Sequence, residues 1–218
     1  MTTRRQTIKL VLSFLAGLSL FGAKIGTGLR TAYAAVKRTL LPRGASMSEL
    51  KDKNPADLDT HLLETTPMDD FNVMGQTTYP VDIDKWRLEL TGDVEQAKIL
   101  TYGEILQLPT VERNVLLICP GFFAYNGLWK GVSSAGLLSK VVLKPDITHV
   151  EFSGPEGIGR KTQEYTIQEV MTGKVFLAYQ VNGRPLPEKH GFPLRLVAED
   201  YYGGQWVKYV NRVSFVAG

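Results

Sequence analysis

The stretch LLICPGFFAYNGLWKGV, residues 116–132, holds the single cysteine of the chain, Cys119. An apolar run precedes this cysteine and a segment rich in glycine and aromatic residues follows it. This pattern predicts a short buried strand over residues 115–118 that ends at a loop. One cysteine cannot form an internal disulfide, so the thiol is inert and buried, paired with another chain, or a ligand or nucleophile.

The N-terminal residues have the pattern of an export signal. Arg4 and Arg5 stand in a charged segment, residues 10–23 are apolar but too short to cross a bilayer, and Ala32-Tyr33-Ala34 is a small-x-small cleavage pattern. The arrangement resembles a twin-arginine (Tat) signal, although two positions depart from its usual residues. We therefore expect residues 1–34 to be a Tat-type signal peptide that directs the protein to the periplasm. The alternative is an uncleaved N-terminal anchor.

The same segment accounts for the basic balance of the chain. The chain has 25 Lys and Arg against 22 Asp and Glu, and residues 1–34 contain five of the basic residues and no acidic one. The remaining 20 basic residues leave a mature chain with a net charge of about −2. The charge therefore gives no reason to expect nucleic-acid binding.

Beyond the signal, the patterning divides the chain in two. Residues 35–65 are polar and show little periodicity, so we expect a linker or an arm on the domain surface. Residues 66–218 have the patterning of one domain. Strands are expected at residues 86–90, 115–118, 149–152, 175–181, 194–198 and 206–210, and short helices after the capping boxes at Thr101 and Thr166 and over residues 134–141. This mixture predicts an α+β fold, mostly β with short helices.

Several common catalytic patterns are missing, including a phosphate loop, a serine elbow and a histidine-rich zinc pattern. The histidines are scattered, and we expect His149 to be structural and His61 to be solvated. Two segments are suited to a ligand. Residues 181–197 are dense in Gly and Pro and end in a strand with Arg195, and residues 201–208 supply adjacent glycines and Lys208. These cations and exposed backbone amides suit an anion such as a phosphate.

Together these segments resemble the molybdopterin-binding domain of the sulfite oxidase family. The matching pieces are Thr66-Pro67 with Phe71; Trp86-x-Leu88-x-Leu90-x-Gly92; Cys119 with Gly121 and Trp129-x-Gly131-Val132; Asn182-Gly183-x-Pro185-Leu186-Pro187-x-x-His190-Gly191-x-Pro193-Leu194-Arg195-Leu196; and Tyr202-Gly203 with Val207-Lys208. The resemblance covers nearly all of residues 66–214. It implies a mixed, mostly β sulfite-oxidase-type fold, without the C-terminal dimerisation domain of many sulfite oxidases.

The resemblance also implies a molybdenum–molybdopterin (Mo-pyranopterin) cofactor. Cys119 becomes the expected metal ligand and catalytic residue, because a soft thiolate suits a metal already bound to sulfur. The alternative is a small, inert, buried cysteine. For Arg195 the alternative is a surface salt bridge. The residues that the resemblance places on the cofactor are Phe71, Asn72, Val73, Cys119, Ser153, Gly154, His190, Arg195, Trp206, Val207 and Lys208.

The implied reaction is a two-electron oxygen-atom transfer, but the substrate is less clear. Sulfite-oxidising members usually have arginines after the cysteine, whereas this chain has no cation there before Lys130. Phe122, Phe123 and Tyr125 are the expected pocket walls, with core packing as the alternative for Phe122. Such an uncharged mouth favours a neutral S-oxide, as in the methionine sulfoxide reductase branch, because desolvating sulfite without a paired cation is costly. A sulfite dehydrogenase is the alternative.

The expected partners follow from the same resemblance. The chain has no Cys-x-x-Cys-His motif, so we expect it to exchange electrons with a soluble cytochrome or a membrane haem protein, which would hold it near the membrane. We also expect a small-molecule substrate and no nucleic acid. Export by the Tat route fits a protein that folds around its cofactor before it crosses the membrane. A rival of another class is a secreted, metal-free binding module with the same fold.

Overall fold

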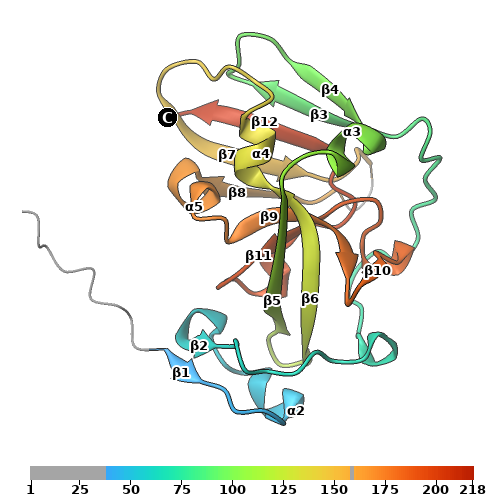
Figure 1. Cartoon of the computed structure of the whole chain (residues 1–218), viewed down its shortest axis with the longest axis vertical. Helices are drawn as coiled ribbons and strands as arrows, with labels where there is room; N and C mark the ends of the chain where they lie inside the picture. The colour runs from blue at the N-terminus through green and yellow to red at the C-terminus, as the bar shows by residue number, and fades with distance from the viewer. Residues whose placement is uncertain (1–37, 158–159) are drawn as a thin grey trace, which may run out of the picture. The chain divides into compact units, whose positions relative to one another are not determined.

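The computed structural model describes residues 38–157 and 160–218 (Figure 1). The expected signal peptide lies outside these residues. Within the described part of the chain, no helix has both the length and the apolar character that crossing a bilayer requires. The strands are β1 (Thr39–Leu40), β2 (Leu58–Asp59), β3 (Arg87–Gly92), β4 (Lys98–Thr101), β5 (Thr110–Cys119), β6 (Phe123–Ser133), β7 (Ile147–Ser153), β8 (Thr162–Thr166), β9 (Val175–Val181), β10 (Arg184–Pro185), β11 (Arg195–Ala198) and β12 (Arg212–Ala217).

The helices between these strands are short. They are α2 (Met47–Leu50), α3 (Tyr102–Leu106), α4 (Ser134–Leu138) and α5 (Ile167–Met171), with the 3-10 turns η1 (Pro55–Asp57), η2 (Met68–Asp70), η3 (Glu188–His190) and η4 (Gly203–Gln205). Both predicted capping boxes are present, Thr101 with Glu104 before α3 and Thr166 with Glu169 before α5. The predicted α+β class, mostly β with short helices, is therefore confirmed.

One five-stranded sheet forms the upper part of the structure in Figure 1 and has the strand order β4-β3-β12-β7-β8. β12 runs parallel to β3, and the other neighbours are antiparallel. Leu88 and Leu90 alternate with polar residues in β3 and are fully buried, as the alternating pattern predicted.

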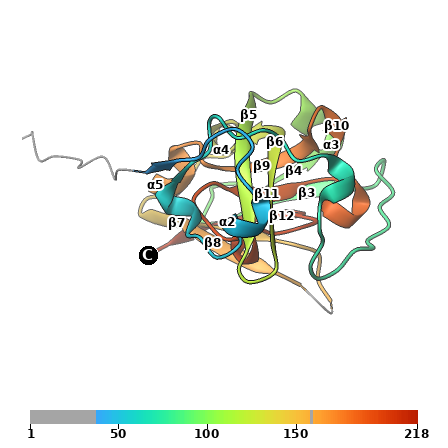
Figure 2. The same cartoon turned by 90° about the horizontal axis from the view of Figure 1, so that it is seen from below.

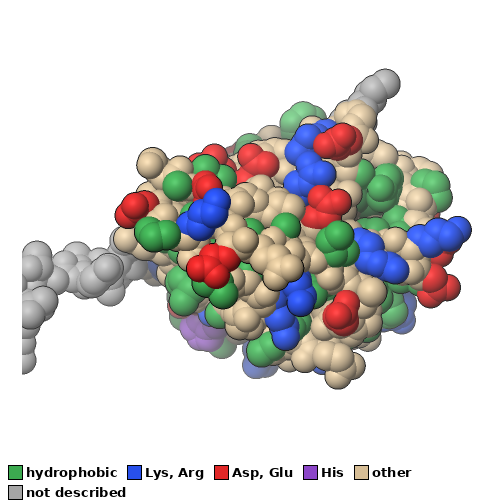
Figure 3. Space-filling view, turned by 90° about the horizontal axis from the view of Figure 1, so that it is seen from above, with side chains coloured by type: hydrophobic (Ala, Val, Ile, Leu, Met, Phe, Trp, Pro, Cys, Tyr) green, Lys and Arg blue, Asp and Glu red, His purple; other side chains and the backbone are tan. Residues whose placement is uncertain are grey.

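Basic and acidic side chains are interspersed on the face that Figure 3 shows, so this face has no uniform basic patch.

The second sheet contains the quoted stretch and has the order β10-β9-β6-β5, with β11 also paired to β9. β9 has the predicted bounds. The register of the antiparallel pairing between β6 and β9 shifts between Lys130 and Gly131. A Cβ atom at Gly131 would lie 2.0 Å from the Leu177 carbonyl oxygen. Only glycine permits this close approach of two backbones.

The prediction of a loop after Cys119 was wrong, because β5 and β6 form a long hairpin there. Most of the loop that we expected after Cys119 is instead the start of strand β6, and β5 is ten residues long rather than four. Proline and glycine indicated a loop, but the turn takes only residues 120–122. Asn126 is buried in β6 because its amide donates to the Leu63 and Glu64 carbonyls and to the Asn114 side chain.

The segment that we expected to be a linker or surface arm packs on this hairpin. Its buried leucines form a separate small core with Leu116, Ile118 and Ala124 of the hairpin. Figure 1 shows α2 below the turn of the hairpin, and in Figure 2, which is seen from below, α2 lies in front of the hairpin. Arg38 at the start of the described arm makes two hydrogen bonds of 2.6 Å to the Asp200 carboxylate. These contacts give the arm a defined path over residues 38–65.

Residues 206–210, which we predicted to be a strand, are irregular. Two hydrogen bonds attach them beside β11, from the Leu196 amide to the Val207 carbonyl and from the Val210 amide to the Leu194 carbonyl. Between these bonds Tyr209 has a φ of 61°, which breaks a regular ladder. The irregular path turns the side chains of Trp206, Lys208 and Tyr209 into a neighbouring cavity.

Candidate cofactor site

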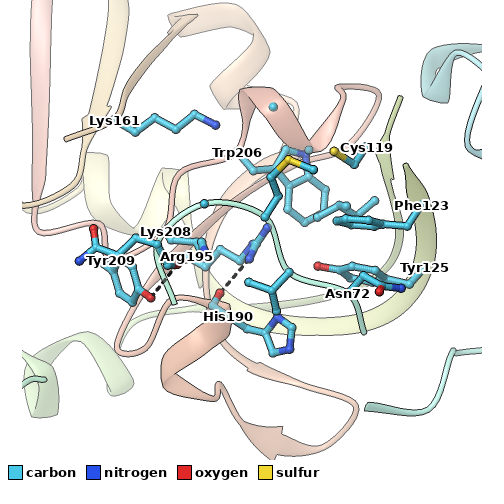
Figure 4. Close-up of a pocket in the computed structure, with 17 residues that line it drawn as sticks. Asn72, Cys119, Phe123, Tyr125, Lys161, His190, Arg195, Trp206, Lys208 and Tyr209 are labelled. Carbon is cyan, nitrogen blue, oxygen red and sulfur yellow. Dashed lines mark hydrogen bonds between the residues drawn. The ribbon is translucent and has the colours of Figure 1, made fainter. Parts of the chain in front are cut away.

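A cavity of about 270 Å³ lies where the turn end of the β5–β6 hairpin meets β11 and the η3 and η4 turns (Figure 4). Segments that are far apart in the sequence contribute to its walls. The residues that line it are Asn72, Val73, Met74, Gly75, Gln76, Leu117, Cys119, Phe123, Tyr125, Lys161, His190, Arg195, Gly203, Gly204, Trp206, Lys208 and Tyr209. None of these residues is acidic, so the cavity has a positive electrostatic character.

Most residues that the sequence assigned to the cofactor or the substrate are in this one cavity. Those that line it are Asn72, Val73, Cys119, Phe123, Tyr125, His190, Arg195, Trp206 and Lys208. The structure thus brings together residues separated by more than a hundred positions in the chain.

Other predicted site residues lie beside the cavity rather than in it. Phe71 is buried behind the wall and stacks on Tyr125, with ring centroids 4.0 Å apart. Val207 is buried in the core, and Ser153 is buried with its hydroxyl near the Thr162 hydroxyl. The Gly154 amide donates to the Lys161 carbonyl. These residues position the walls and have no surface in the cavity.

Phe122 was wrongly assigned as a pocket wall. Its side chain is 69% exposed and does not line the cavity, so the alternative of core packing is wrong as well. The physical reason is the pleat of the hairpin. Phe123 and Tyr125 are two positions apart in β6 and point to the same face, whereas Phe122 belongs to the turn.

Cys119 is the last residue of β5, and its half-buried thiol faces the cavity (Figure 4). Burial raises the pKa of this thiol, and the positive charge of Lys161 opposes that rise. In the described residues no cluster of three His, Cys, Asp or Glu side chains could hold a metal ion. A metal bound to Cys119 would therefore need ligands that the described protein does not supply.

Arg195 begins β11 and is 6% exposed. Its Nη1 donates to the His190 carbonyl at 2.8 Å, and its guanidinium lies 5.5 Å from the Trp129 ring and 5.3 Å from the Trp206 ring. Its Nε has no hydrogen-bond partner, and no described carboxylate pairs with it. A surface salt bridge is therefore ruled out for Arg195. A buried guanidinium without an anion is costly, so this position is suited to an anionic ligand.

Lys208 and Tyr209 fasten the rim of the cavity. The Lys208 ammonium and the Tyr209 hydroxyl both donate to the Gln76 carbonyl, and Lys208 also donates to the Lys189 carbonyl at 3.2 Å. Residues 72–76 are thereby attached to the segment after η4. Burial, together with the charges of Arg195 and Lys161, lowers the pKa of Lys208 to about 8. An anion in the cavity would stabilise the charged form of this lysine.

His190 ends the η3 turn and is 1% exposed. Its ring meets Phe71 edge-on at a centroid distance of 5.6 Å, and its Nε2 has no hydrogen-bond partner. Burial, with the charge of Arg195 second, lowers the pKa of His190 from 6.5 to about 4. The imidazole is therefore neutral at pH 7 and could accept or donate one hydrogen bond to a ligand.

The lowered pKa of His190 predicts how the stability of the cofactor-free protein depends on pH. Between pH 6.5 and pH 4 the unfolded chain binds a proton at this residue that the folded chain does not bind. The free energy of unfolding should therefore fall as pH falls through this window. Urea unfolding of the wild type and of His190→Gln at several pH values would measure this, with His61→Gln as an exposed control. Equal slopes in the wild type and His190→Gln would contradict it.

Some residues of the cavity had no signal in the sequence. Lys161 comes from the segment between β7 and β8, where no motif marks a site. Gly203 was noted as one of two adjacent glycines, and the structure gives the reason for its small size. A Cβ atom at Gly203 would lie 2.9 Å from the Leu117 side chain. A sequence can mark a glycine, but it does not show which distant side chain the glycine makes room for.

Comparisons with known proteins show what the chain is similar to. The model of a family described as the oxidoreductase molybdopterin binding domain matches residues 75–218. The chain is 28% identical over 142 residues to the uncharacterized oxidoreductase YuiH of Bacillus subtilis (strain 168), which covers 65% of this chain and 70% of YuiH. It is also 28% identical over 156 residues to the protein-methionine-sulfoxide reductase catalytic subunit MsrP of Gluconobacter oxydans, covering 65% of this chain and 49% of MsrP.

A further match is a nitrate reductase [NADH] of Brassica napus, 27% identical over 208 residues, which covers 78% of this chain and 23% of the reductase. Among solved structures, the sulfane dehydrogenase SoxCD from Paracoccus pantotrophus matches with a TM-score of 0.65 and 22% identity over 83% of this chain and 51% of that one. At this identity the likeness concerns the fold alone. The chain thus spans about half of MsrP and of SoxCD, and less than a quarter of the nitrate reductase.

Proposed function

Because the chain belongs to the oxidoreductase molybdopterin binding domain family, we propose that it is an exported enzyme that binds a molybdenum–pterin cofactor beside Cys119 and transfers an oxygen atom to or from a small substrate. Family membership makes the protein a molybdopterin-dependent oxidoreductase. We further propose which residues bind the cofactor, which substrate and redox partner the enzyme uses, and that the protein is exported.

The observation that carries this proposal is a single thiol and a buried, unpaired guanidinium that share one cavity without acidic residues. Cys119 is the only cysteine of the chain, and Arg195 Nε and His190 Nε2 are buried polar atoms that have no hydrogen-bond partner among the residues that the structure describes. Buried polar atoms are almost always hydrogen-bonded, so these atoms indicate a polar ligand in the working protein. A phosphate-bearing cofactor with a thiophilic metal fits both ends of the cavity.

Each residue then has a definite task. The Cys119 thiolate would bind the metal, and Arg195 and Lys208 would bind the phosphate through charge-assisted hydrogen bonds. Trp206 covers one side of the guanidinium and keeps water from it. Residues 72–76 form the exposed rim and would cover the pterin. When bound, the cofactor supplies two-electron oxygen-atom chemistry, and the protein supplies orientation and charge.

For the substrate we propose a small sulfur–oxygen compound, either an S-oxide that is reduced or sulfite that is oxidised. The names of MsrP and SoxCD refer to sulfur compounds, and Phe123, Tyr125 and Leu117 give the cavity an apolar wall. A soluble cytochrome or a membrane haem protein would exchange the electrons. The substrate would reach the cavity beside the exposed rim of residues 72–76.

Metal analysis tests the proposal directly. The full chain, produced in cells supplied with molybdate, should contain stoichiometric molybdenum. It should either oxidise a reduced viologen dye with methionine sulfoxide or dimethyl sulfoxide, or reduce ferricyanide with sulfite. A purified protein without molybdenum, inactive in both directions, would instead indicate a metal-free binding module with the same fold.

Export makes a separate prediction. The double variant Arg4→Lys and Arg5→Lys should accumulate in the cytoplasm, because a Tat signal requires the arginine pair. Arg30→Lys, a control in the same basic segment, should be exported as the wild type is. Fractionation and the intact mass of the exported protein would show both the compartment and the cleavage position. Equal export of the double variant and the wild type would contradict a Tat signal.

A further inference from the structure

Lys161 brings a positive charge to the part of the cavity that the sequence indicated to be uncharged. It is half-buried, lines the cavity and extends toward it from the segment just before β8 (Figure 4). The positive charge of Lys161 lowers the pKa of the Cys119 thiol against the rise that burial causes. The Cys119 thiolate in turn raises the pKa of Lys161. The expected absence of a cation near Cys119 is therefore wrong.

Lys161 differs from the other cations of the cavity in its partners. Arg195 donates to the His190 carbonyl, and Lys208 donates to the carbonyls of Gln76 and Lys189. Within residues 38–157 and 160–218, neither a carboxylate nor a hydrogen-bond acceptor engages the Lys161 ammonium. Burial and the charge of Arg195 lower the pKa of Lys161, so an anion beside it would be stabilising.

The backbone around Lys161 is held in place. The Gly154 amide donates to the Lys161 carbonyl at 2.9 Å, and a Cβ atom at Gly154 would lie 3.1 Å from the Lys208 carbonyl oxygen. Gly154 therefore joins the segments that carry the two lysines. This contact explains how a glycine outside the cavity can affect it, and it fixes the point from which the Lys161 side chain extends.

We infer that Lys161 sets the charge preference of the cavity by drawing an anionic group of the substrate toward the Cys119 sulfur. The inference rests on the proposed function for the identity of the substrate, but the attraction itself belongs to the protein. A free ammonium half-removed from water attracts an anion more strongly than a solvated surface lysine does. Lys161 thereby favours the anionic compound, sulfite, over a neutral S-oxide, which is the reverse of the preference expected from the sequence.

The single thiol provides a test that needs neither cofactor nor turnover. In the full chain without cofactor, Cys119 can be alkylated by iodoacetate, an anion, or by iodoacetamide, its neutral analogue. In both reactions the thiolate displaces iodide from the methylene carbon, so a change in thiolate fraction affects both rates equally. The ratio of the two rates therefore isolates the attraction of the anion. Lys161→Met should lower this ratio on the order of fivefold, and Lys161→Arg should retain it.

Lys140→Met is the matched control, because Lys140 is exposed, lies outside the cavity and undergoes the same change of charge. Its ratio should equal that of the wild type. Sulfate should slow iodoacetamide labelling of the wild type more than that of Lys161→Met, in which Arg195 and Lys208 remain as anion-binding cations of the cavity. An unchanged ratio in Lys161→Met, or an equal loss of both rates, would overturn the inference. Circular dichroism and the melting temperature would show that each variant is folded, with Lys161→Gln as the replacement if Lys161→Met is not.

The holoenzyme separates this inference from the proposed function. If sulfite is turned over, Lys161→Met should raise the KM for sulfite about fivefold and leave kcat and molybdenum content unchanged. The KM for dimethyl sulfoxide, a neutral substrate, should change less than the KM for sulfite. A protein without molybdenum would end the proposed function, yet the alkylation ratio would still decide whether Lys161 attracts anions to Cys119.

Discussion

Arg195→Met is expected to weaken cofactor binding strongly while leaving the fold intact. Arg195 is 6% exposed, and among the described residues no carboxylate pairs with it and its Nε has no hydrogen-bond partner. Replacing a buried ion pair by apolar side chains of similar volume is often neutral or stabilising by about 1–4 kcal/mol, and replacing Arg195 leaves no partner carboxylate buried and unpaired. The same substitution removes a charge-assisted contact to a phosphate, which costs about 2–5 kcal/mol, or roughly 30-fold to several thousand-fold in affinity. The substitution should therefore separate stability from binding.

Melting temperatures of the cofactor-free proteins and molybdenum content after purification would measure the two effects. Arg195→Lys is the informative companion, because it keeps the charge but loses the planar group between Trp129 and Trp206. Arg212→Met provides a control on an arginine that pairs with Glu89 at 2.9 Å outside the cavity. A large fall in the melting temperature of Arg195→Met with full molybdenum content would show that Arg195 is a structural residue.

Cys119→Ser should abolish turnover in a folded protein. A serine hydroxyl is not deprotonated at neutral pH and is a hard oxygen donor, so it replaces a thiolate poorly on a thiophilic metal. Losing a supporting group around a metal ligand typically costs 10–100-fold, so loss of the ligand itself should cost at least about a hundredfold in kcat. Steady-state rates and molybdenum content, measured on the same sample, would distinguish an inactive metal site from an empty one.

Phe122→Ala is the control for Cys119→Ser, because Phe122 lies at the same turn but is exposed and outside the cavity. It should have wild-type turnover. Near-normal rates in Cys119→Ser would contradict a role for the sulfur in the reaction. In that case Cys119 would be a passive residue at the end of β5.

Local patterns predicted the elements whose structure depends on neighbouring residues. β9 is a run of apolar and β-branched residues, and it was predicted with its observed bounds. The capping boxes at Thr101 and Thr166 predicted α3 and α5, because a cap joins residues only three positions apart. In these segments local propensity and the final fold agree.

The long hairpin could not be predicted from such patterns. β6 contains glycines at positions 127 and 131 and a buried asparagine, all of which disfavour a strand locally. Its stability depends on distant partners, such as the carbonyls of Leu63 and Glu64 that bind Asn126. Tertiary contacts therefore outweighed local propensity along the whole strand.

Cavity residues that belong to a sequence motif were predicted, whereas those that only tertiary contacts bring to the cavity were missed. His190, Arg195 and Lys208 belong to sequence motifs that resemble a known family, so their grouping was expected. Lys161 belongs to no motif, and only the sheet β12-β7-β8 places it opposite Cys119. The charge near the thiol therefore could not be deduced from the residues that follow Cys119 in the chain.

The cavity walls come from positions as far apart as residues 72 and 209. A ligand that touches both would act as a reversible cross-link across most of the domain, and constraints on long loops remove much chain entropy from partly unfolded states. Loaded molecules should consequently outlast empty ones in the presence of proteases. Degradation would thus act as a form of quality control, removing the molecules that had failed to acquire their ligand.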